Sequence, residues 1–397
     1  MKRSTKARIK RWSVLPLCLL ICVGMYFCAR ALAQHIFSNT AAEAGGAGTA
    51  DVREGLWCYN SLNAREQQVY EAIEWAADGR RRTSRRVAFV PTEEEFIRAV
   101  QALSADRPEY CDVLWQESRM EAGAYSACVR LTYMEDDAQR RKAMREAARV
   151  LLAGVRTEGG WDCARGLHDA LVSRVTYSAQ DGDTVSAVGS TAYDALVLGL
   201  SDSTGYAAAY TYLCREAGIS CMTVTGMATD GTAEFRHAWN ALMPEDVPGY
   251  TDVMWNDAAA IELPFHGYYF LSLEEMGADH TPDGYLQLSG GDTNHFYERE
   301  GCFADTEEEI PALLVRILTE ARREGTYWAE LCIPREVGLP DYALEEYLNE
   351  AIAAVNADEA QSDLPKLRTV NRIYHASVAG GGMTVQLFYE NRSEETE

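Results

Sequence analysis

The sequence predicts an α+β protein, and three observations support this class. A helical stripe and a helix-capping pattern open the folded region near Leu56. A helix at 203–217 is followed by three runs with strand character, at 219–226, 234–243 and 249–255. The C-terminal part again carries both helical and strand patterns. With 397 residues, the chain has room for two or three compact units, each with its own core.

The N-terminal part of the folded region, 56–155, is predicted to mix helices and strands. Apolar residues recur at helical spacing over 62–77. Thr92 followed by Glu95 predicts a capping box that starts a short helix ending near Leu103. Three further elements are expected from alternation or from a charged helical pattern: strands at 112–118 and 124–134 and a helix at 137–155.

A core is expected at 156–275 and a C-terminal extension at 276–397. The core begins with a helix at 162–175, which leads through a polar loop to the helix at 203–217, and strand character resumes at 268–272. The elements predicted in the extension are helices at 307–324 and 341–356 and strands at 327–333, 367–375 and 383–389, the last two joined by a Gly-Gly-Gly turn.

The N-terminus has the pattern of an export segment. Six Lys and Arg side chains precede an apolar run at 12–29, and the positive end of such a segment stays in the cytoplasm. Ala31 and Ala33 are small residues at the spacing that a signal peptidase uses, while an 18-residue run is at the lower limit for crossing a bilayer. Residues 1–33 are therefore either a cleaved signal peptide or a retained membrane anchor, and 34–55 is expected to be a flexible linker. Both readings place the folded region outside the cytoplasm.

The charge of the chain excludes one class of partner. The net charge is -23, and after residue 34 there are 30 basic against 60 acidic side chains. Such a surface repels nucleic acid, so nucleic-acid binding is not expected. One basic cluster, five arginines between Arg80 and Arg86, interrupts this pattern. It is interpreted either as a solvated loop or as a contact with an anionic polymer or the membrane surface.

Eight cysteines follow the apolar run, and no pair has the Cys-x-x-Cys spacing of a zinc or redox site. An even number in an exported chain permits disulfides, although eight cysteines allow 105 connectivities. Alternatively, they are small buried hydrophobic residues. Three histidines, His266, His280 and His295, also lack any standard metal-binding spacing, so no metal site is predicted.

Three ordered segments carry the residues of an acyl-transfer centre. Ser203-Thr204-Gly205-Tyr206 opens the helix at 203–217, His237-Ala-Trp239-Asn240 lies on the second strand, and Asp252-Val-Met-Trp255 lies on the third. A helix N-terminus favours negative charge on a nucleophile. An imidazole can take the proton of that nucleophile, and a carboxylate can hold the other N–H of the imidazole. Ser203, His237 and Asp252 are therefore the candidate catalytic residues.

These segments resemble the bacterial transglutaminase-like family of the papain-type cysteine superfamily. Its pattern reads Cys-x-Gly-Tyr-Ala, then His-Ala-Trp-Asn, then Asp-x-x-Trp-Asp. Leu167-His168-Asp169 and Asp279-His280-Thr281 match further motifs of the family, and the resemblance covers about 56–300. It implies an active-site helix packed on an antiparallel sheet. It also implies an ancestral acyl transfer or amide hydrolysis on a peptide glutamine or a related amide, without a metal or another cofactor.

The chain departs from the family at the nucleophile, because Ser203 stands where the family has cysteine and Asp202 precedes it. A hydroxyl is much harder to deprotonate than a thiol, and an adjacent carboxylate opposes an anion further. One reading is a degenerate domain at the cell surface that binds a peptide, a protein or a wall polymer, or has a structural role. The other is a serine hydrolase or acyltransferase with a Ser203-His237-Asp252 triad. The expected support residues around the cleft are Thr204, Gly205, Tyr206, Trp239, Asn240 and Trp255. A retained N-terminal segment would add the membrane as a partner.

Overall fold

The computed structural model describes residue 53 and residues 55–134, 137–155, 160–178, 190–245, 248–258, 263–283, 296–334, 337–361, 363–374 and 382–389. The predicted signal or anchor at 1–33, most of the linker at 34–55, the start of the Gly-Gly-Gly turn, and His295 lie outside these residues. In the part that is described, no helix is long and apolar enough to cross a membrane. The folded region, Gly55–Glu397, forms one compact unit.

The N-terminal region has the mixed character that the sequence predicts. Its elements are α2 (Trp57–Ser61), α3 (Ala64–Asp78), α4 (Glu93–Asp106), a short 3-10 turn η2 (Trp115–Glu117), and the antiparallel pair β1 (Arg119–Ala122) and β2 (Ala127–Arg130). The predicted capping box of Thr92 and Glu95 starts α4, and a second box, of Asn63 and Glu66, starts α3. These boxes satisfy backbone N–H groups that a helix start leaves unpaired.

The strand predicted at 112–118 is wrong, because a buried charge fixes a turn there. The Asp112 side chain is fully buried, 2.9 Å from Nε of Arg80 and 2.6 Å from Nε of Arg141. A buried carboxylate needs such partners, and they outweigh the strand propensity of its neighbours. Arg80 is thus part of an internal ion pair, and the guanidinium groups of Arg81 and Arg85 lie over the ring of Trp75.

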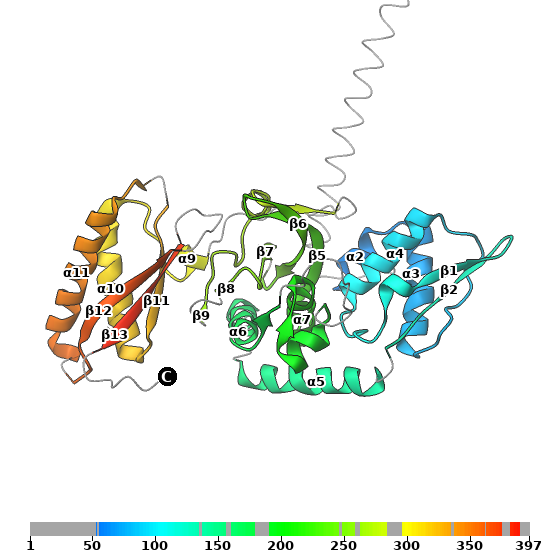
Figure 1. Cartoon of the computed structure of the whole chain (residues 1–397), viewed down its shortest axis with the longest axis horizontal. Helices are drawn as coiled ribbons and strands as arrows, with labels where there is room; N and C mark the ends of the chain where they lie inside the picture. The colour runs from blue at the N-terminus through cyan, green and yellow to red at the C-terminus, as the bar shows by residue number, and fades with distance from the viewer. Residues whose placement is uncertain are drawn as a thin grey trace, which may run out of the picture. The chain divides into compact units, whose positions relative to one another are not determined.

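The core consists of a helix packed on an antiparallel sheet, as predicted (Figure 1). The sheet has the strand order β10 (His280–Pro282), β5 (Ser220–Thr229), β6 (Glu234–Met243) and β7 (Gly249–Thr251), and all its pairings are antiparallel. Helix α7 (Ser203–Glu216) packs against β5 and β6. The remaining core elements are α5 (Asp137–Gly154), α6 (Gly160–Val172), β3 (Thr176–Tyr177), the π-helical turn η3 (Asp194–Leu198), β4 (Leu200–Ser201), β8 (Asp257–Ala258) and β9 (Leu263–Pro264).

The two faces of the central sheet belong to two different hydrophobic clusters. Leu242 is buried in the cluster that contains α7, whereas Trp239 and Ala241 are buried in the cluster of the N-terminal helices. Side chains alternate between the faces of a strand, and the register of β5 with β6 runs without a bulge. Odd-numbered residues of β6 therefore face the N-terminal region, and even-numbered ones face α7.

The third strand ends earlier than the sequence predicts, because Asp252 turns the chain. The prediction was a strand at 249–255, but β7 stops at Thr251. The Asp252 carboxylate accepts hydrogen bonds from the backbone N–H groups of Met254 and Trp255, which closes a turn of the kind that Asp favours. The predicted strand at 268–272 is reduced to a bridge between Leu271 and Tyr250.

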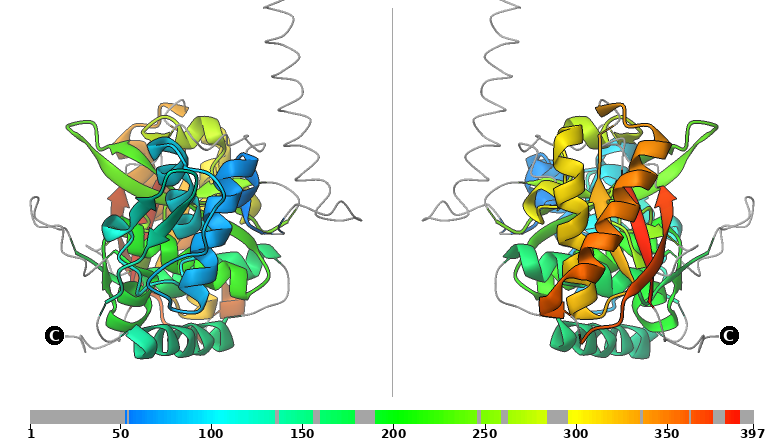
Figure 2. Two further views of the ribbon diagram at one scale, coloured as in Figure 1. Left: turned by 90° about the vertical axis from the view of Figure 1, so that its right-hand side faces the viewer. Right: turned by 90° about the vertical axis from the view of Figure 1, so that its left-hand side faces the viewer.

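Within this compact unit, the C-terminal extension adds another layer of helices on a sheet. The strands are β11 (Trp328–Cys332), β12 (Leu367–Tyr374) and β13 (Gly382–Tyr389), in the order β11-β13-β12. Helices α10 (Ile310–Glu324) and α11 (Asp341–Ala357) pack on each other and contact this sheet (Figure 2). The remaining short elements are α8 (Leu273–Met276), α9 (Phe296–Arg299), η4 (Glu307–Glu309) and η6 (Glu359–Gln361).

Candidate functional site

A buried imidazole–carboxylate pair lies where the sequence places the catalytic base. His237 comes from β6, and Asp252 follows β7 directly. His237 Nε2 is 2.5 Å from Asp252 Oδ2, and both side chains are about 1% exposed. The other carboxylate oxygen, Oδ1, lies 3.1 Å from the backbone nitrogens of Met254 and Trp255. Asp252 is therefore fixed by the turn that it forms, and it holds the imidazole of His237 by one nitrogen.

A second histidine shares the same carboxylate oxygen. His280, on β10, places Nε2 at 3.1 Å from Asp252 Oδ2, and its Nδ1 lies 2.5 Å from Asp279 Oδ1. Burial alone would lower the pKa of His280, but the two carboxylates outweigh burial and raise the pKa to about 9. Burial would raise the pKa of Asp252, but His237 and His280 hold it well below its ordinary value. At neutral pH, Asp252 is ionised and His280 is protonated.

Two tryptophans complete this side of the sheet. The ring of Trp239 stacks beside that of His237, with 6.4 Å between the ring centroids, and the Trp255 ring lies 5.3 Å from His237 and 4.6 Å from His280. Both residues were predicted as cleft support. His280 was not predicted as a site residue, although Asp279-His280-Thr281 had been matched to a family motif.

Ser203 occupies the first turn of α7, as predicted, but its hydroxyl is not joined to the imidazole. Asp202 is the N-cap of this helix and accepts a hydrogen bond from the Gly205 N–H at 3.1 Å. Burial raises the pKa of Asp202, while the hydrogen bond from Ser190 opposes that rise. Within the described parts of the chain, neither Ser203 Oγ nor His237 Nδ1 forms a hydrogen bond.

The remaining predicted support residues lie on the α7 side of the sheet and act in packing. Asn240 Nδ2 donates to the Ala207 carbonyl at 2.8 Å and to Thr211 Oγ1 at 2.9 Å, so Asn240 ties β6 to α7. The Tyr206 hydroxyl lies 2.9 Å from the Val175 carbonyl oxygen and 2.5 Å from Asp257 Oδ2. Gly205 is buried, and Thr204 is partly buried beside it in the first turn.

Among the residues that the structure describes, no cysteine is a hydrogen-bond partner of His237. All eight cysteines after the apolar run are buried and free of disulfides. This agrees with the alternative that they are small buried hydrophobic residues. Cys214 and Cys221, the two nearest to the core motifs in sequence, are buried in the α7-side cluster, and burial raises the pKa of Cys214 well above its ordinary value. No hydrogen bond joins a described thiol to His237.

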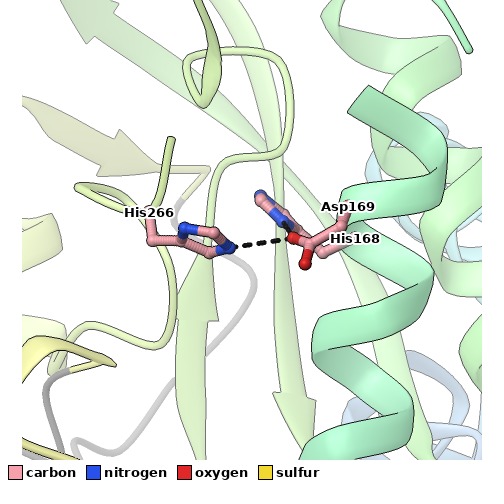
Figure 3. Close-up of side chains that lie close together, drawn as sticks. All are labelled: His168, Asp169 and His266. Carbon is pink, nitrogen blue, oxygen red and sulfur yellow. Dashed lines mark hydrogen bonds and ion pairs between the residues drawn. The ribbon is translucent and has the colours of Figure 1, made fainter. Parts of the chain in front are cut away.

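A second histidine–carboxylate cluster is formed by His168, Asp169 and His266 (Figure 3). Asp169 Oδ1, from α6, lies 2.8 Å from His168 Nδ1 and 2.8 Å from His266 Nε2. The other nitrogen of His266, Nδ1, is 2.7 Å from Glu330 Oε2 on β11. Both carboxylates outweigh the effect of burial and raise the pKa of His266 to about 10, whereas burial lowers the pKa of His168. One imidazolium and one neutral imidazole therefore share Asp169.

Among the described residues, two sets have donor atoms close enough together to hold a metal ion, within 4.8 Å of one another: His237 with Asp252 and His280, and His168 with Asp169 and His266. Their ligand atoms come from elements far apart in the sequence. For this reason the spacing of the histidines along the chain gave no metal-binding pattern.

The comparisons with known proteins support the resemblance for the core. Residues 145–250 match the family model of the Transglutaminase-like superfamily, so the chain contains a domain of this superfamily. That range includes Ser203 and His237 and ends two residues before Asp252. A solved structure described as "Crystal structure of a TGase" is 9% identical, with a TM-score of 0.26, over 34% of this chain and 43% of that one. This chain therefore spans less than half of that structure. No curated protein matches.

Proposed function

We propose that this protein is a catalytically degenerate transglutaminase-like protein that works by binding or as a structural component at the outer face of the cell membrane. One observation carries the proposal: the nucleophile position holds a hydroxyl, Ser203, without a hydrogen bond to the His237–Asp252 pair. All eight described cysteines are buried elsewhere. The thiolate that performs acyl transfer in the resembling family has no counterpart at this position.

The surroundings of Ser203 also oppose its activation. A nucleophile at a helix N-terminus benefits from the free N–H groups there, but Asp202 already uses the Gly205 N–H as its capping partner. When ionised, the Asp202 carboxylate would stand next to any alkoxide, and like charges disfavour each other. A hydroxyl starts from a much higher pKa than a thiol, so it needs more help from its surroundings than a cysteine would.

The cellular setting of the proposal rests on the N-terminal sequence. The basic residues followed by an apolar run are typical of an export segment, either cleaved or retained as an anchor. The strongly acidic folded region argues against a nucleic-acid partner. We therefore propose a peptide, a protein or a wall polymer as the partner, held outside the cytoplasm.

An active serine hydrolase or acyltransferase is the second candidate, and a specific observation favours it. In the described part of the chain, Ser203 Oγ and His237 Nδ1 both lack a hydrogen-bond partner, and they are the two atoms that a nucleophile–base pair would join. His237 meets Asp252 through Nε2, which leaves Nδ1 available as the base. Catalytic hydrogen bonds often tighten only when substrate binds, so their absence in a free enzyme does not exclude this function.

Labelling with a fluorophosphonate separates the two functions. The degenerate reading predicts that the purified full chain takes up no label beyond the level of Ser203→Ala. Labelling of the unaltered chain that disappears in both Ser203→Ala and His237→Ala would establish the serine enzyme and overturn the primary proposal. Ser201→Ala, which removes a neighbouring buried hydroxyl on β4, is the matched control and should not change the result.

A cysteine introduced at the nucleophile position tests whether the cleft is intact. If the cleft is intact, the helix N-terminus and the His237 imidazole should give Ser203→Cys a thiol that reacts with iodoacetamide well below the ordinary thiol pKa of about 8.5. His237→Ala in the same background should move that titration upward. If the introduced thiol is inert to iodoacetamide throughout, the site has collapsed, and both cleft binding and catalysis are removed.

A further inference from the structure

We propose that His237, Asp252 and His280 form a binding site for a divalent transition-metal ion of the zinc type. The three residues come from β6, from the turn after β7 and from β10, and the sheet brings their side chains to one face. His237 Nε2 and His280 Nε2 lie 2.5 and 3.1 Å from Asp252 Oδ2, and the three atoms are within 4.8 Å of one another. Two imidazoles and one carboxylate are a donor set that zinc accepts.

The spacing suits such an ion after a small expansion. Zinc binds nitrogen and oxygen at about 2.0–2.2 Å, which in a tetrahedral site separates neighbouring ligands by roughly 3.3 Å. The two contacts to Asp252 therefore need to lengthen by about 0.8 Å for His237 and about 0.2 Å for His280. Two imidazole nitrogens also argue against magnesium and calcium, which prefer oxygen ligands.

The other polar atoms of the three ligand side chains form hydrogen bonds, or stay free, in the way that a metal site requires. His280 Nδ1 is 2.5 Å from Asp279 Oδ1, so it can donate to a carboxylate while Nε2, once the ion has displaced its proton to solvent, binds the ion. This carboxylate–histidine arrangement fixes the tautomer and strengthens the ligand. Asp252 keeps Oδ1 on the N–H groups of Met254 and Trp255, which leaves Oδ2 for the ion. In the described surroundings, nothing donates to His237 Nδ1, so this atom can carry the ring proton.

The cluster of His168, Asp169 and His266 has a similar composition, but the hydrogen bonds of His168 do not leave its Nδ1 free to bind an ion. Asn256 Nδ2 lies 3.0 Å from His168 Nε2, and Asn256 Oδ1 accepts the Tyr268 N–H at 2.8 Å, which fixes the orientation of the amide. His168 Nε2 must therefore accept a hydrogen bond, and the ring proton sits on Nδ1, facing Asp169. Binding a metal through Nδ1 would move the proton to Nε2, directly against the amide N–H. We therefore expect this cluster to stay hydrogen-bonded, and it supplies the control.

A bound ion would also act on His237 itself. With Nε2 on the metal, the only ring proton of a neutral imidazole lies on Nδ1, the atom that would otherwise accept a proton from residue 203. In Ser203→Cys, the ion should therefore slow alkylation by iodoacetamide. This effect depends on the position of His237 and not on any natural activity of the protein.

The test measures metal binding by the full chain, prepared without a histidine tag and treated with a chelator. Zinc is titrated by calorimetry, and cobalt is added separately because tetrahedral Co²⁺ gives a visible spectrum. We expect one ion per folded chain, loss of this binding in His280→Gln, and an affinity 10- to 100-fold weaker in Asp279→Asn. Asp169→Asn, in the second cluster, should bind as the unaltered chain does.

Each other result overturns the proposal. Absence of binding by the folded chain excludes the site, and retention of the same affinity in His280→Gln places the ion elsewhere. Loss in Asp169→Asn assigns the ion to the second cluster. If His280→Gln does not fold, Asp279→Asn decides, since the Asp279 side chain is 20% exposed and its substitution keeps the shape. An unchanged affinity in that variant then refutes the assignment.

Discussion

Glu330 is a buried carboxylate whose loss should destabilise the fold through electrostatics. This buried carboxylate of β11 accepts three hydrogen bonds: from His266 Nδ1 at 2.7 Å, from the His266 backbone N–H at 2.9 Å and from the Tyr297 hydroxyl at 2.5 Å. It therefore joins the extension to the core loop and to α9. Glu330→Gln keeps the size of the side chain but removes the charge, and its amide N–H₂ can no longer accept from His266.

The expected cost follows from the burial of the pair. Removing one partner of a buried, hydrogen-bonded ion pair costs about 3–5 kcal/mol, because the other charge stays buried with less compensation. Asp169 remains as a partner of His266, so we expect about 3 kcal/mol, at the lower end of that range. Urea unfolding of the full chain at pH 7 measures this loss in the free energy of unfolding. The matched control is Glu320→Gln, which breaks an exposed pair with Arg316 and should cost no more than about 0.5 kcal/mol.

The pH dependence of stability supplies an independent signature of the same pair. The pKa of His266 is about 10 in the folded protein and about 6.5 in an unfolded chain. Between these values the folded state holds a proton that the unfolded state has released. The stabilisation is complete below pH 6.5 and is lost as the pH rises toward 10, with a slope of about 1.4 kcal/mol per pH unit. Glu330→Gln should flatten this slope relative to the unaltered chain. A cost equal to that of Glu320→Gln, or an unchanged slope, would refute the reasoning.

Two further substitutions test the packing that positions the site. Asn240→Ala removes the donor to the Ala207 carbonyl between β6 and α7 and leaves buried polar groups unpaired, so urea unfolding should show a loss of about 2 kcal/mol. In Gly226→Ala the added Cβ would lie 2.2 Å from the Thr281 carbonyl oxygen, so β10 must shift, and we expect a loss of about 3 kcal/mol in the same assay. Gly154→Ala, which has open space around the new Cβ, should be neutral or slightly stabilising, and an equal loss there would contradict this explanation.

The elements that were predicted correctly are those with strong local signals. The pattern of β6 gave its bounds, 234–243, and the pair Thr92 and Glu95 gave the start of α4. The errors occur where a side chain overrides local propensity. Asp252 turns the chain where the apolar pattern continues, and buried Asp112 is held by two arginines that come from distant parts of the chain. Neither effect can be read from a window of neighbouring residues.

The candidate site was predicted only in part, for a related reason. His237 and Asp252 follow an ordered family pattern, so their contact could be expected. His280 shares the same oxygen only because β10 pairs with β5, and Glu330 reaches His266 from 64 residues away. Such contacts depend on topology, which the spacing of the residues along the chain does not determine.

The persistence of His237 and Asp252 has a physical explanation that does not require turnover. Asp252 is a buried charge, and a buried carboxylate is tolerated only when it is compensated. Its four contacts, two imidazoles and two backbone N–H groups, supply this compensation and close the turn after β7. Replacing His237 alone would leave the charge with one imidazole fewer, at a cost of several kcal/mol. A chain that lost its nucleophilic thiol would therefore keep the imidazole and the carboxylate for stability, and their presence by itself is no evidence of catalysis.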